Sequence, residues 1–210
     1  MRRGFLGGAF NPPHMGHLVL AQEALGQLEL DSVTLIPMGT APHREIVDDP
    51  GAEVRFELCE AAVGGDERLA ASRLEVDREG PSYTVETLEV LKKEHPKDDL
   101  VWILGGDQAA RLRTWREPEK VLELATVAAT ERGAWRRAGI FVELAQLRNS
   151  RRIVFFEMIP IGLSSTYIRR RVARGQPIRY LVPDAVGAYI AAYHLYRTAA
   201  DRTERRTAAT

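Results

Sequence analysis

The stretch FLGGAFNPPHMGHLVLAQEAL, residues 5–25, joins two apolar runs through a short segment rich in glycine, proline and histidine. Two glycines close the first run. Pro12 and Pro13 then keep a helix from starting before His14, because proline fixes φ and the residue before a proline avoids helical geometry. In the second run the apolar residues recur every three or four positions. The stretch therefore predicts a strand, a constrained loop and a helix, the repeating unit of an α/β protein.

The same alternation continues along the chain. Short runs rich in β-formers predict strands at residues 4–8, 32–38, 69–76, 100–106, 126–130 and 153–161. Helical spacing predicts helices at residues 16–28, 52–63, 84–94, 118–124, 139–148 and 183–193. Repetition of strand and helix predicts an α/β fold with a doubly wound, mostly parallel sheet and helices on both faces. Ligands of such sheets bind beyond the carboxyl ends of the strands, so the strand-to-helix junctions are the candidate sites.

Length and composition indicate an ordinary globular protein. The chain has 210 residues, of which 45% are hydrophobic and 28% charged, and this length suits one domain. We expect a single domain over residues 1–197. Residues 198–210 form a polar segment, which we expect to be a disordered tail without a role in the chemistry.

Charge and cysteine content exclude several classes of protein. Lys plus Arg equals Asp plus Glu, at 29 each, which argues against a nucleic-acid or membrane binder. Cys59 is the only cysteine, so the chain has no internal disulfide and no cysteine-based zinc site, and we expect this residue in the core. No apolar stretch is long enough for a signal peptide or a membrane span, which predicts a cytoplasmic location.

The first candidate site is the junction after the first strand. Gly7 and Gly8 leave room for backbone N–H groups to meet an anion. His14 lies in the loop and His17 in the first helical turn, where unpaired N–H groups and the helix dipole favour negative charge. Gly16 lets a ligand approach the helix end. Two imidazoles in this field suit donors to a polyphosphate whose charge grows during a reaction.

Other interpretations of this junction stay open at this point. The two histidines could ligate a metal, although no nearby carboxylate or cysteine completes a ligand set. They could also be incidental residues of a structural loop. The glycine spacing fits neither the dinucleotide-binding fingerprint nor a P-loop.

A second candidate site lies in IPIGLSSTYIRRR, residues 159–171. Ser164, Ser165 and Thr166 are strong N-cap candidates after a strand. Helical side chains lean toward the N-terminus, so Arg169 can reach back over whatever the hydroxyls and amides hold. Alone, these residues could be an ordinary cap and a solvated arginine run. Together with the first junction they suggest a nucleoside triphosphate held from two sides.

These motifs resemble a known family. GGAFNPPHMGH is similar to the H-x-G-H signature of the nucleotidyltransferase superfamily, and LSSTYIR to its S-S-T-x-I-R element. Further segments resemble bacterial nicotinate-nucleotide adenylyltransferases in order and spacing: APHR at 41–44, GPSYTVETL at 80–88, LGGDQAARLRTW at 104–115 and RYLVPDAVGAYI at 179–190. The resemblance covers roughly residues 3–196.

The resemblance implies a fold and a reaction. The fold is the Rossmann-like, nucleotidyltransferase type of doubly wound sheet. The reaction is transfer of AMP from ATP to nicotinate mononucleotide, which gives deamido-NAD and pyrophosphate in NAD biosynthesis. It would proceed by in-line attack of the acceptor phosphate on the α-phosphorus, without a covalent intermediate. Mg²⁺ would be bound mainly through the ATP phosphates, with no protein metal ligands.

The resemblance also implies roles for individual residues, with His14, His17 and Arg169 as the catalytic ones. The implied ATP contacts are Gly7, Gly8, Ala9, Phe10, Asn11, His14, His17, Gly105, Asp107, Ile161, Ser164, Ser165, Thr166 and Arg169. The implied contacts to the acceptor nucleotide are Arg44, Tyr83, Thr84, Asp107, Trp115 and Arg132.

Three of these residues have simpler interpretations. Arg44 could be an exposed loop arginine, Asp107 could be the N-cap of a short helix, and Trp115 could be a core residue.

The chain departs from the family pattern at three places. Ala9 stands where the family often has threonine, and Asn11 where it often has aspartate. In TERGAW, residues 130–135, Arg132 and Gly133 align with the family's Arg-Pro-Gly only without its proline. The direction of Arg132 is therefore open.

Other functions compete with the favoured one. The acceptor could be nicotinamide mononucleotide or a pantetheine phosphate, or the chain could transfer a cytidylyl group. It could also be a module that binds ATP without turnover, or a nucleic-acid binder that uses YIRRRVAR at residues 167–174. The sequence leaves open whether the protein forms a homo-oligomer.

Overall fold

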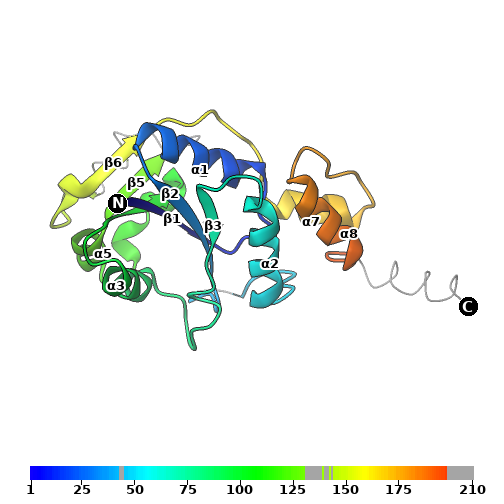
Figure 1. The fold of residues 1–210 in the computed structure, drawn as a ribbon, viewed down its shortest axis with the longest axis horizontal. Helices are drawn as coiled ribbons and strands as arrows, with labels where there is room; N and C mark the ends of the chain where they lie inside the picture. The colour runs from blue at the N-terminus through cyan, green and yellow to red at the C-terminus, as the bar shows by residue number, and fades with distance from the viewer. Residues whose placement is uncertain (43–44, 131–138, 140–141, 143, 198–210) are drawn as a thin grey trace, which may run out of the picture.

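Six strands form one sheet in the computed structural model, which describes residues 1–42, 45–130, 139, 142 and 144–197 (Figure 1). The strands are β1 (Arg2–Gly8), β2 (Ser32–Pro37), β3 (Leu69–Ala71), β4 (Asp99–Leu104), β5 (Thr126–Thr130) and β6 (Ile153–Phe156). Their order is β3-β2-β1-β4-β5-β6, and every neighbouring pair is parallel. The predicted parallel α/β sheet is confirmed.

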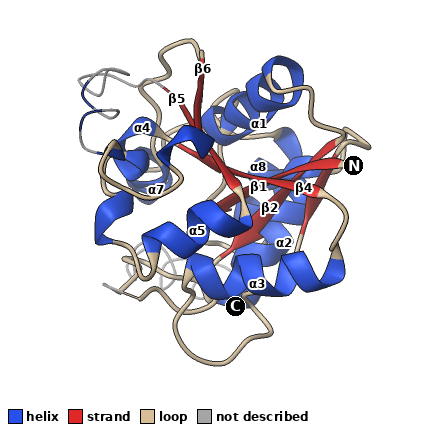
Figure 2. Ribbon diagram, turned by 90° about the vertical axis from the view of Figure 1, so that its left-hand side faces the viewer, coloured by secondary structure: helices blue, strands red, loops and turns tan. Residues whose placement is uncertain are grey.

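Helices cover both faces of this sheet, as predicted. The helices among the described residues are α1 (Met15–Gln27), α2 (Ala52–Val63), α3 (Thr84–Glu94), α4 (Gly106–Ala109), α5 (Pro118–Leu124), α7 (Ser165–Ala173) and α8 (Asp184–Ala192). Figures 1 and 2 show α1 on one side of the sheet and α3 and α5 on the other. Of the helix predicted at residues 139–148, residues 140, 141 and 143 lie outside the described residues, and residues 145–148 form turns and a bend, so the predicted helix end was wrong. The tail predicted at residues 198–210 lies outside the described residues.

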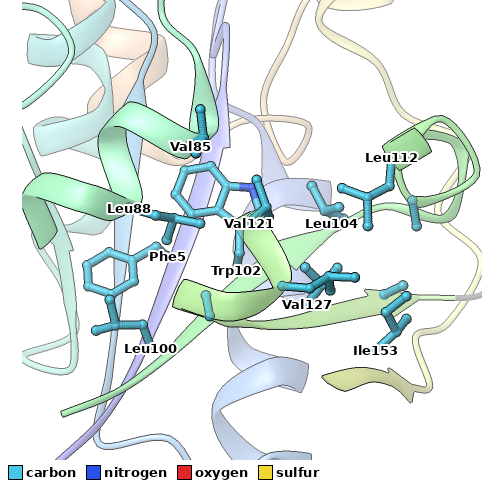
Figure 3. Packing of buried hydrophobic residues seen from close by; sticks show 14 of the residues in the cluster. Phe5, Val85, Leu88, Leu100, Trp102, Leu104, Leu112, Val121, Val127 and Ile153 are labelled. Carbon is cyan, nitrogen blue, oxygen red and sulfur yellow. The ribbon is translucent and has the colours of Figure 1, made fainter. Parts of the chain in front are cut away.

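The strands bury alternate residues on opposite faces, because successive side chains of a strand point to opposite sides. Phe5 and Trp102 pack with Leu88 of α3 and Val121 of α5 on one face (Figure 3). Leu6, the next residue along β1, lies on the other face, in a cluster with residues of α1 and α2. Cys59 belongs to that second cluster and is fully buried, as predicted, and burial raises the pKa of its thiol.

A third apolar cluster lies at one end of the sheet. It joins Leu58 of α2 to Ile168 of α7 and to Val186 and Ile190 of α8. Figure 1 shows α7 and α8 beside α2 at that end of the molecule. Among the described helices, none has both the length and the apolar character needed to cross a membrane.

Four strands end earlier than the sequence predicts. β2 ends at Pro37, one residue early, and β4 ends at Leu104 and not at residue 106, because Gly105 is the N-cap of α4 and Gly106 its first residue.

β3 and β6 end where side-chain oxygens accept the next backbone hydrogen bonds. β3 stops at Ala71, after which the Leu74 N–H donates to Ser72 Oγ at 3.2 Å and starts a turn. β6 stops at Phe156, after which the Glu157 N–H donates to Gln27 Oε1 of α1 at 2.9 Å. The predictions of strands to residues 76 and 161 were therefore wrong at their ends.

The strand order reverses at β1 and β4. The chain leaves β1 toward α1 and leaves β4 toward α4, so both strand-to-helix junctions open at the same edge of the sheet. This is the place where open α/β sheets bind ligands.

Candidate active site

The loop between β1 and α1 is held in an uncommon backbone conformation. Phe10 has φ 47°, a left-handed value that is rare for a bulky residue. Its buried ring lies beneath Gly8, where an added Cβ would be 3.3 Å from the ring, and meets His17 edge-on with ring centroids 5.0 Å apart. The Phe10 side chain thus packs against both the loop and the His17 imidazole.

The structure gives a reason for glycine at position 7 that the sequence did not show. A Cβ at Gly7 would lie 2.6 Å from the indole of Trp102, so the core needs this glycine. The prediction that Gly7 clears space for a ligand is not needed to explain the residue, because the indole occupies the space on that side.

The two imidazoles form a pair at the start of α1. His14 occupies the N-cap position and is buried, and its ring stacks on that of His17 with centroids 3.8 Å apart. The His14 backbone N–H donates to His17 Nδ1 at 3.2 Å. Because Nδ1 accepts this bond, the proton of the neutral ring lies on Nε2. A Cβ at Gly16 would lie 3.1 Å from the His14 ring, so the glycine lets that ring lie against the first helical turn.

The start of α7 meets the loop before α1. Ser164 is the N-cap of α7, and its Oγ accepts the Tyr167 N–H at 3.2 Å, so the ordinary capping role is real. Ser165 Oγ donates to the Pro12 carbonyl at 2.8 Å. The predicted convergence of two helix N-termini, about 150 residues apart in sequence, is therefore confirmed; Figure 1 shows the beginning of α1 beside α7.

Arg169 reinforces this junction from one turn further along α7. The side chain is buried, and its guanidinium donates to the Asn11 carbonyl at 2.9 Å. Its Nε donates to Asp48 Oδ2 at 3.3 Å. The guanidinium thus curls back over the loop, as the lean of helical side chains predicts.

Two other predicted residues lie at the same junction. Ile161 precedes α7, and its Cγ2 would be 3.7 Å from a Cβ added at Gly16. Thr166 lies exposed in the first turn of α7.

Arg55 is a residue of this site that the sequence analysis missed. It lies in α2 and is fully buried. Its guanidinium donates to the carbonyls of Ala9 at 3.3 Å and Gly39 at 3.0 Å, to that of Met38, and to Asp49 Oδ1 at 2.9 Å. One buried arginine therefore ties the loop between β1 and α1 to the end of β2.

A signal for Arg55 is present in the sequence. The apolar face of α2 carries Leu58, Cys59 and Ala62, and Arg55 falls on that face one turn earlier. A charged residue there must find buried partners, because burying an unpaired charge costs on the order of several kcal/mol.

A second group of predicted residues lies at the start of α3. Tyr83 is at the N-cap position of α3, Thr84 is its first residue, and the Arg116 guanidinium lies over the Tyr83 ring, 4.7 Å from its centroid. Trp115 and Tyr83 pack against the same apolar cluster and are both only partly buried. Trp115 is thus a residue at the margin of the core, with part of its indole accessible.

The segment before α3 is attached firmly to the end of β2. The Ser82 N–H donates to the Thr40 carbonyl at 2.8 Å, and Ser82 Oγ accepts the Gly39 N–H at 3.0 Å. Glu75 is buried, which raises the pKa of its carboxyl, and it accepts the Thr87 hydroxyl at 2.5 Å. These contacts place the N-terminus of α3 next to the segment that follows β2.

Asp107 lies just beyond β4 and is exposed. The N-cap of α4 is Gly105, whose carbonyl accepts the N–H groups of Gln108 and Ala109. The alternative prediction that Asp107 is itself the cap was wrong. Its carboxylate therefore stands at the switch point without a capping role.

Two predicted residues cannot be placed. Arg44 and Arg132 lie outside the described residues. Within the described part of the chain, no group of three or more His, Cys, Asp and Glu side chains is arranged to hold a metal ion.

Comparison with known proteins gives a consistent result. The model of the Cytidylyltransferase-like family matches residues 5–171. A protein of Thermus thermophilus named "probable nicotinate-nucleotide adenylyltransferase" is 42% identical over 94% of this chain and 100% of its own length. One of Rubrobacter xylanophilus with the same name is 38% identical over 97% of this chain and 95% of its own length.

Solved structures support the fold. The nicotinic acid mononucleotide adenylyltransferase of Plasmodium falciparum complexed with NaAD superposes with a TM-score of 0.75. The match covers 93% of this chain and 97% of that one, at 17% sequence identity, which bears on the fold alone. From the matched family model and the near full-length relatives, the chain belongs to the Cytidylyltransferase-like family and, within it, to the nicotinate-nucleotide adenylyltransferases.

Proposed function

We propose that this protein transfers AMP from ATP to nicotinate mononucleotide, with deamido-NAD and pyrophosphate as products. The observation that carries the proposal is the meeting of the α1 and α7 N-termini, with His14, His17 and Arg169 around them. A triphosphate suits this site because its negative charge is favoured by two helix N-termini, two imidazoles and a guanidinium. An uncharged ligand would gain nothing from these groups' charge. The nicotinate-nucleotide substrate follows from the family to which the chain belongs.

The reaction needs positioning and charge stabilisation from the protein. The acceptor is a phosphate monoester whose oxygen is already deprotonated, so it can attack the α-phosphorus of ATP in line, and the α–β P–O bond breaks to release pyrophosphate. Negative charge grows on the phosphate oxygens during this step. His17 presents its Nε2–H as a fixed donor, because the His14 N–H holds Nδ1. No side chain is required as a nucleophile or general base.

Magnesium enters with ATP as part of the substrate in this proposal. We assign the loop between β1 and α1, residues 9–14, to the ATP phosphates and call it the phosphate loop. The carboxylates beside it, Asp48 and Asp49, pair with Arg169 and Arg55. The groups offered to the phosphates are amides, hydroxyls, imidazoles and a guanidinium, which suits a cation held by phosphate oxygens. Mg²⁺ would neutralise part of the triphosphate charge.

We assign the acceptor to the side of the switch point that carries α3 and the residues after β4. Trp115 would offer a flat apolar face to the pyridine ring, beside Tyr83 and Thr84. Asp107 would accept hydrogen bonds from ribose hydroxyls, since its carboxylate is not used as a cap.

The proposal is tested by pyrophosphate release in the presence of MgATP and different acceptors. We expect release to depend on nicotinate mononucleotide, with deamido-NAD as the product identified by mass. Nicotinamide mononucleotide and phosphopantetheine should give much slower release. Faster turnover with either of these would assign another acceptor, and ATP binding without any turnover would indicate a binding module.

Replacement of Trp115 by alanine tests the assignment of the acceptor side. We expect the KM for nicotinate mononucleotide to rise by about 10-fold, as loss of an aromatic stacking contact typically costs on the order of 1 kcal/mol or more, with a smaller change for ATP. Trp115→Phe keeps a flat ring and should retain most of the affinity. Equal changes in the two KM values would move the indole out of the acceptor pocket.

A further inference from the structure

The end of the described chain returns to the phosphate loop. The Tyr196 hydroxyl donates to Asn11 Oδ1 at 2.7 Å, a contact across 185 residues of sequence. The Tyr196 ring packs against the apolar cluster formed by α2, α7 and α8. This contact brings a residue that follows the last helix into the surroundings of the candidate ATP site.

Asn11 uses its whole side-chain amide. It is buried, and its Nδ2 donates to the Val47 carbonyl at 2.9 Å and more weakly to the Asp48 carbonyl at 3.4 Å. Since both carbonyls can only accept, the amide nitrogen must face them and the oxygen must face Tyr196. An ionised aspartate at this position could accept from Tyr196 but could not donate to either carbonyl.

The backbone of Asn11 extends the connection to the candidate phosphate clamp. Its carbonyl accepts the Arg169 guanidinium at 2.9 Å, and the same guanidinium pairs with Asp48. Asp48 itself has φ 52°, a left-handed conformation that the hydrogen bonds from Asn11 help to hold. Of the two groups that orient Arg169, one is therefore the Asn11 carbonyl itself, and the other belongs to Asp48, whose backbone carbonyl accepts a hydrogen bond from the Asn11 side chain.

The surroundings keep Tyr196 as a donor. Burial raises the pKa of the Tyr196 hydroxyl, and the nearby Asp49 adds to this effect against the opposing charges of Arg169 and Arg55. The hydroxyl accordingly keeps its proton and donates it to Asn11.

We propose that Tyr196 and Asn11 are positioning residues for ATP, which act through Arg169. The Tyr196 hydroxyl fixes the amide plane of Asn11, and the Asn11 amide in turn fixes residues 47 and 48. The Arg169 guanidinium is held between the Asn11 carbonyl and the Asp48 carboxylate. This inference rests on the proposed function only in taking Arg169 as a group that meets the ATP phosphates. It assigns the region after α8 a role in the ATP half of the site and none in the acceptor half.

Tyr196→Phe is the direct test, because it removes the hydroxyl and keeps the packed ring. We expect the KM for ATP to rise about three- to tenfold, as for loss of one buried hydrogen bond, while the KM for nicotinate mononucleotide changes less than about twofold. The matched control is Tyr193→Phe, in which the altered tyrosine is 64% exposed and stacks on Tyr189. Thermal unfolding of both variants should match the parent within a few degrees.

Two outcomes would overturn the proposal. One is a Tyr196→Phe enzyme whose KM for ATP equals that of the Tyr193→Phe control. The other is a rise in both KM values together with a lowered melting temperature, which would make the hydroxyl a general structural contact.

A double-mutant cycle tests the connection through Asn11. Asn11→Ala should raise the KM for ATP at least as much as Tyr196→Phe, and adding Tyr196→Phe to it should have little further effect, because the hydroxyl has then lost its acceptor. Fully additive effects would show that the two residues act independently and would reject the connection.

Calorimetric titration with ATP separates this inference from the proposed function. If the parent protein binds ATP but makes no deamido-NAD, the proposed function fails while the variants still report on positioning through their Kd for ATP. If the parent transfers AMP and Tyr196→Phe binds ATP as tightly as the parent, the positioning role fails alone.

Discussion

A His17→Ala enzyme is expected to turn over about 10² to 10³ times more slowly than the parent, the usual cost of losing one preorganised transition-state donor. The reason is local. The His14 N–H occupies Nδ1, the Phe10 ring contacts the imidazole edge-on, and the His14 ring stacks on it, so Nε2–H is presented in one orientation. The measurement is the steady-state rate of pyrophosphate release at saturating ATP and nicotinate mononucleotide.

Two further variants make this prediction specific. His17→Gln can place an amide N–H near the position of Nε2 and should recover part of the lost rate. His95→Ala serves as the control, since His95 follows α3 and lies near Asp98, away from the phosphate loop. An unchanged rate in His17→Ala, or an equal loss in His95→Ala, would remove His17 from the catalytic step.

Arg55→Met should lower the free energy of unfolding by about 3–5 kcal/mol, the usual cost of removing one partner from a buried charged network. Methionine has the length of the arginine stem as far as Nε but cannot donate to the carbonyls of Ala9, Met38 and Gly39, which then stay buried without this donor. Urea denaturation followed by circular dichroism measures the change.

Arg68→Met is the matched control for this prediction. Arg68 pairs with Asp66 on the surface, with 58% of its side chain exposed, so its loss should change the unfolding midpoint far less than the loss of Arg55. Similar unfolding midpoints for Arg55→Met and Arg68→Met would contradict the role of Arg55 in holding the phosphate loop to β2.

The order of strands and helices follows closely from local patterns in the chain. Alternating apolar runs, the prolines at 12 and 13 and the hydroxyl residues at 164–166 predict the elements and the two helix starts. Local patterns could not predict that β3 ends at Ala71 and β6 at Phe156. After these residues, backbone N–H groups donate to side-chain oxygens of Ser72 and Gln27.

Some features of the candidate site likewise follow from local sequence, and others depend on the tertiary structure. Periodicity, helix capping and the phosphate-binding tendency of helix N-termini depend on neighbours within a few residues, so the chain alone indicates the fold class and the two anion sites. Other features depend on contacts between distant segments: the packing of Gly7 on Trp102, the buried bonds of Arg55, and the contact of Tyr196 with Asn11. Their partners become neighbours only when the sheet closes and the helices pack, and no local pattern encodes which partner that will be.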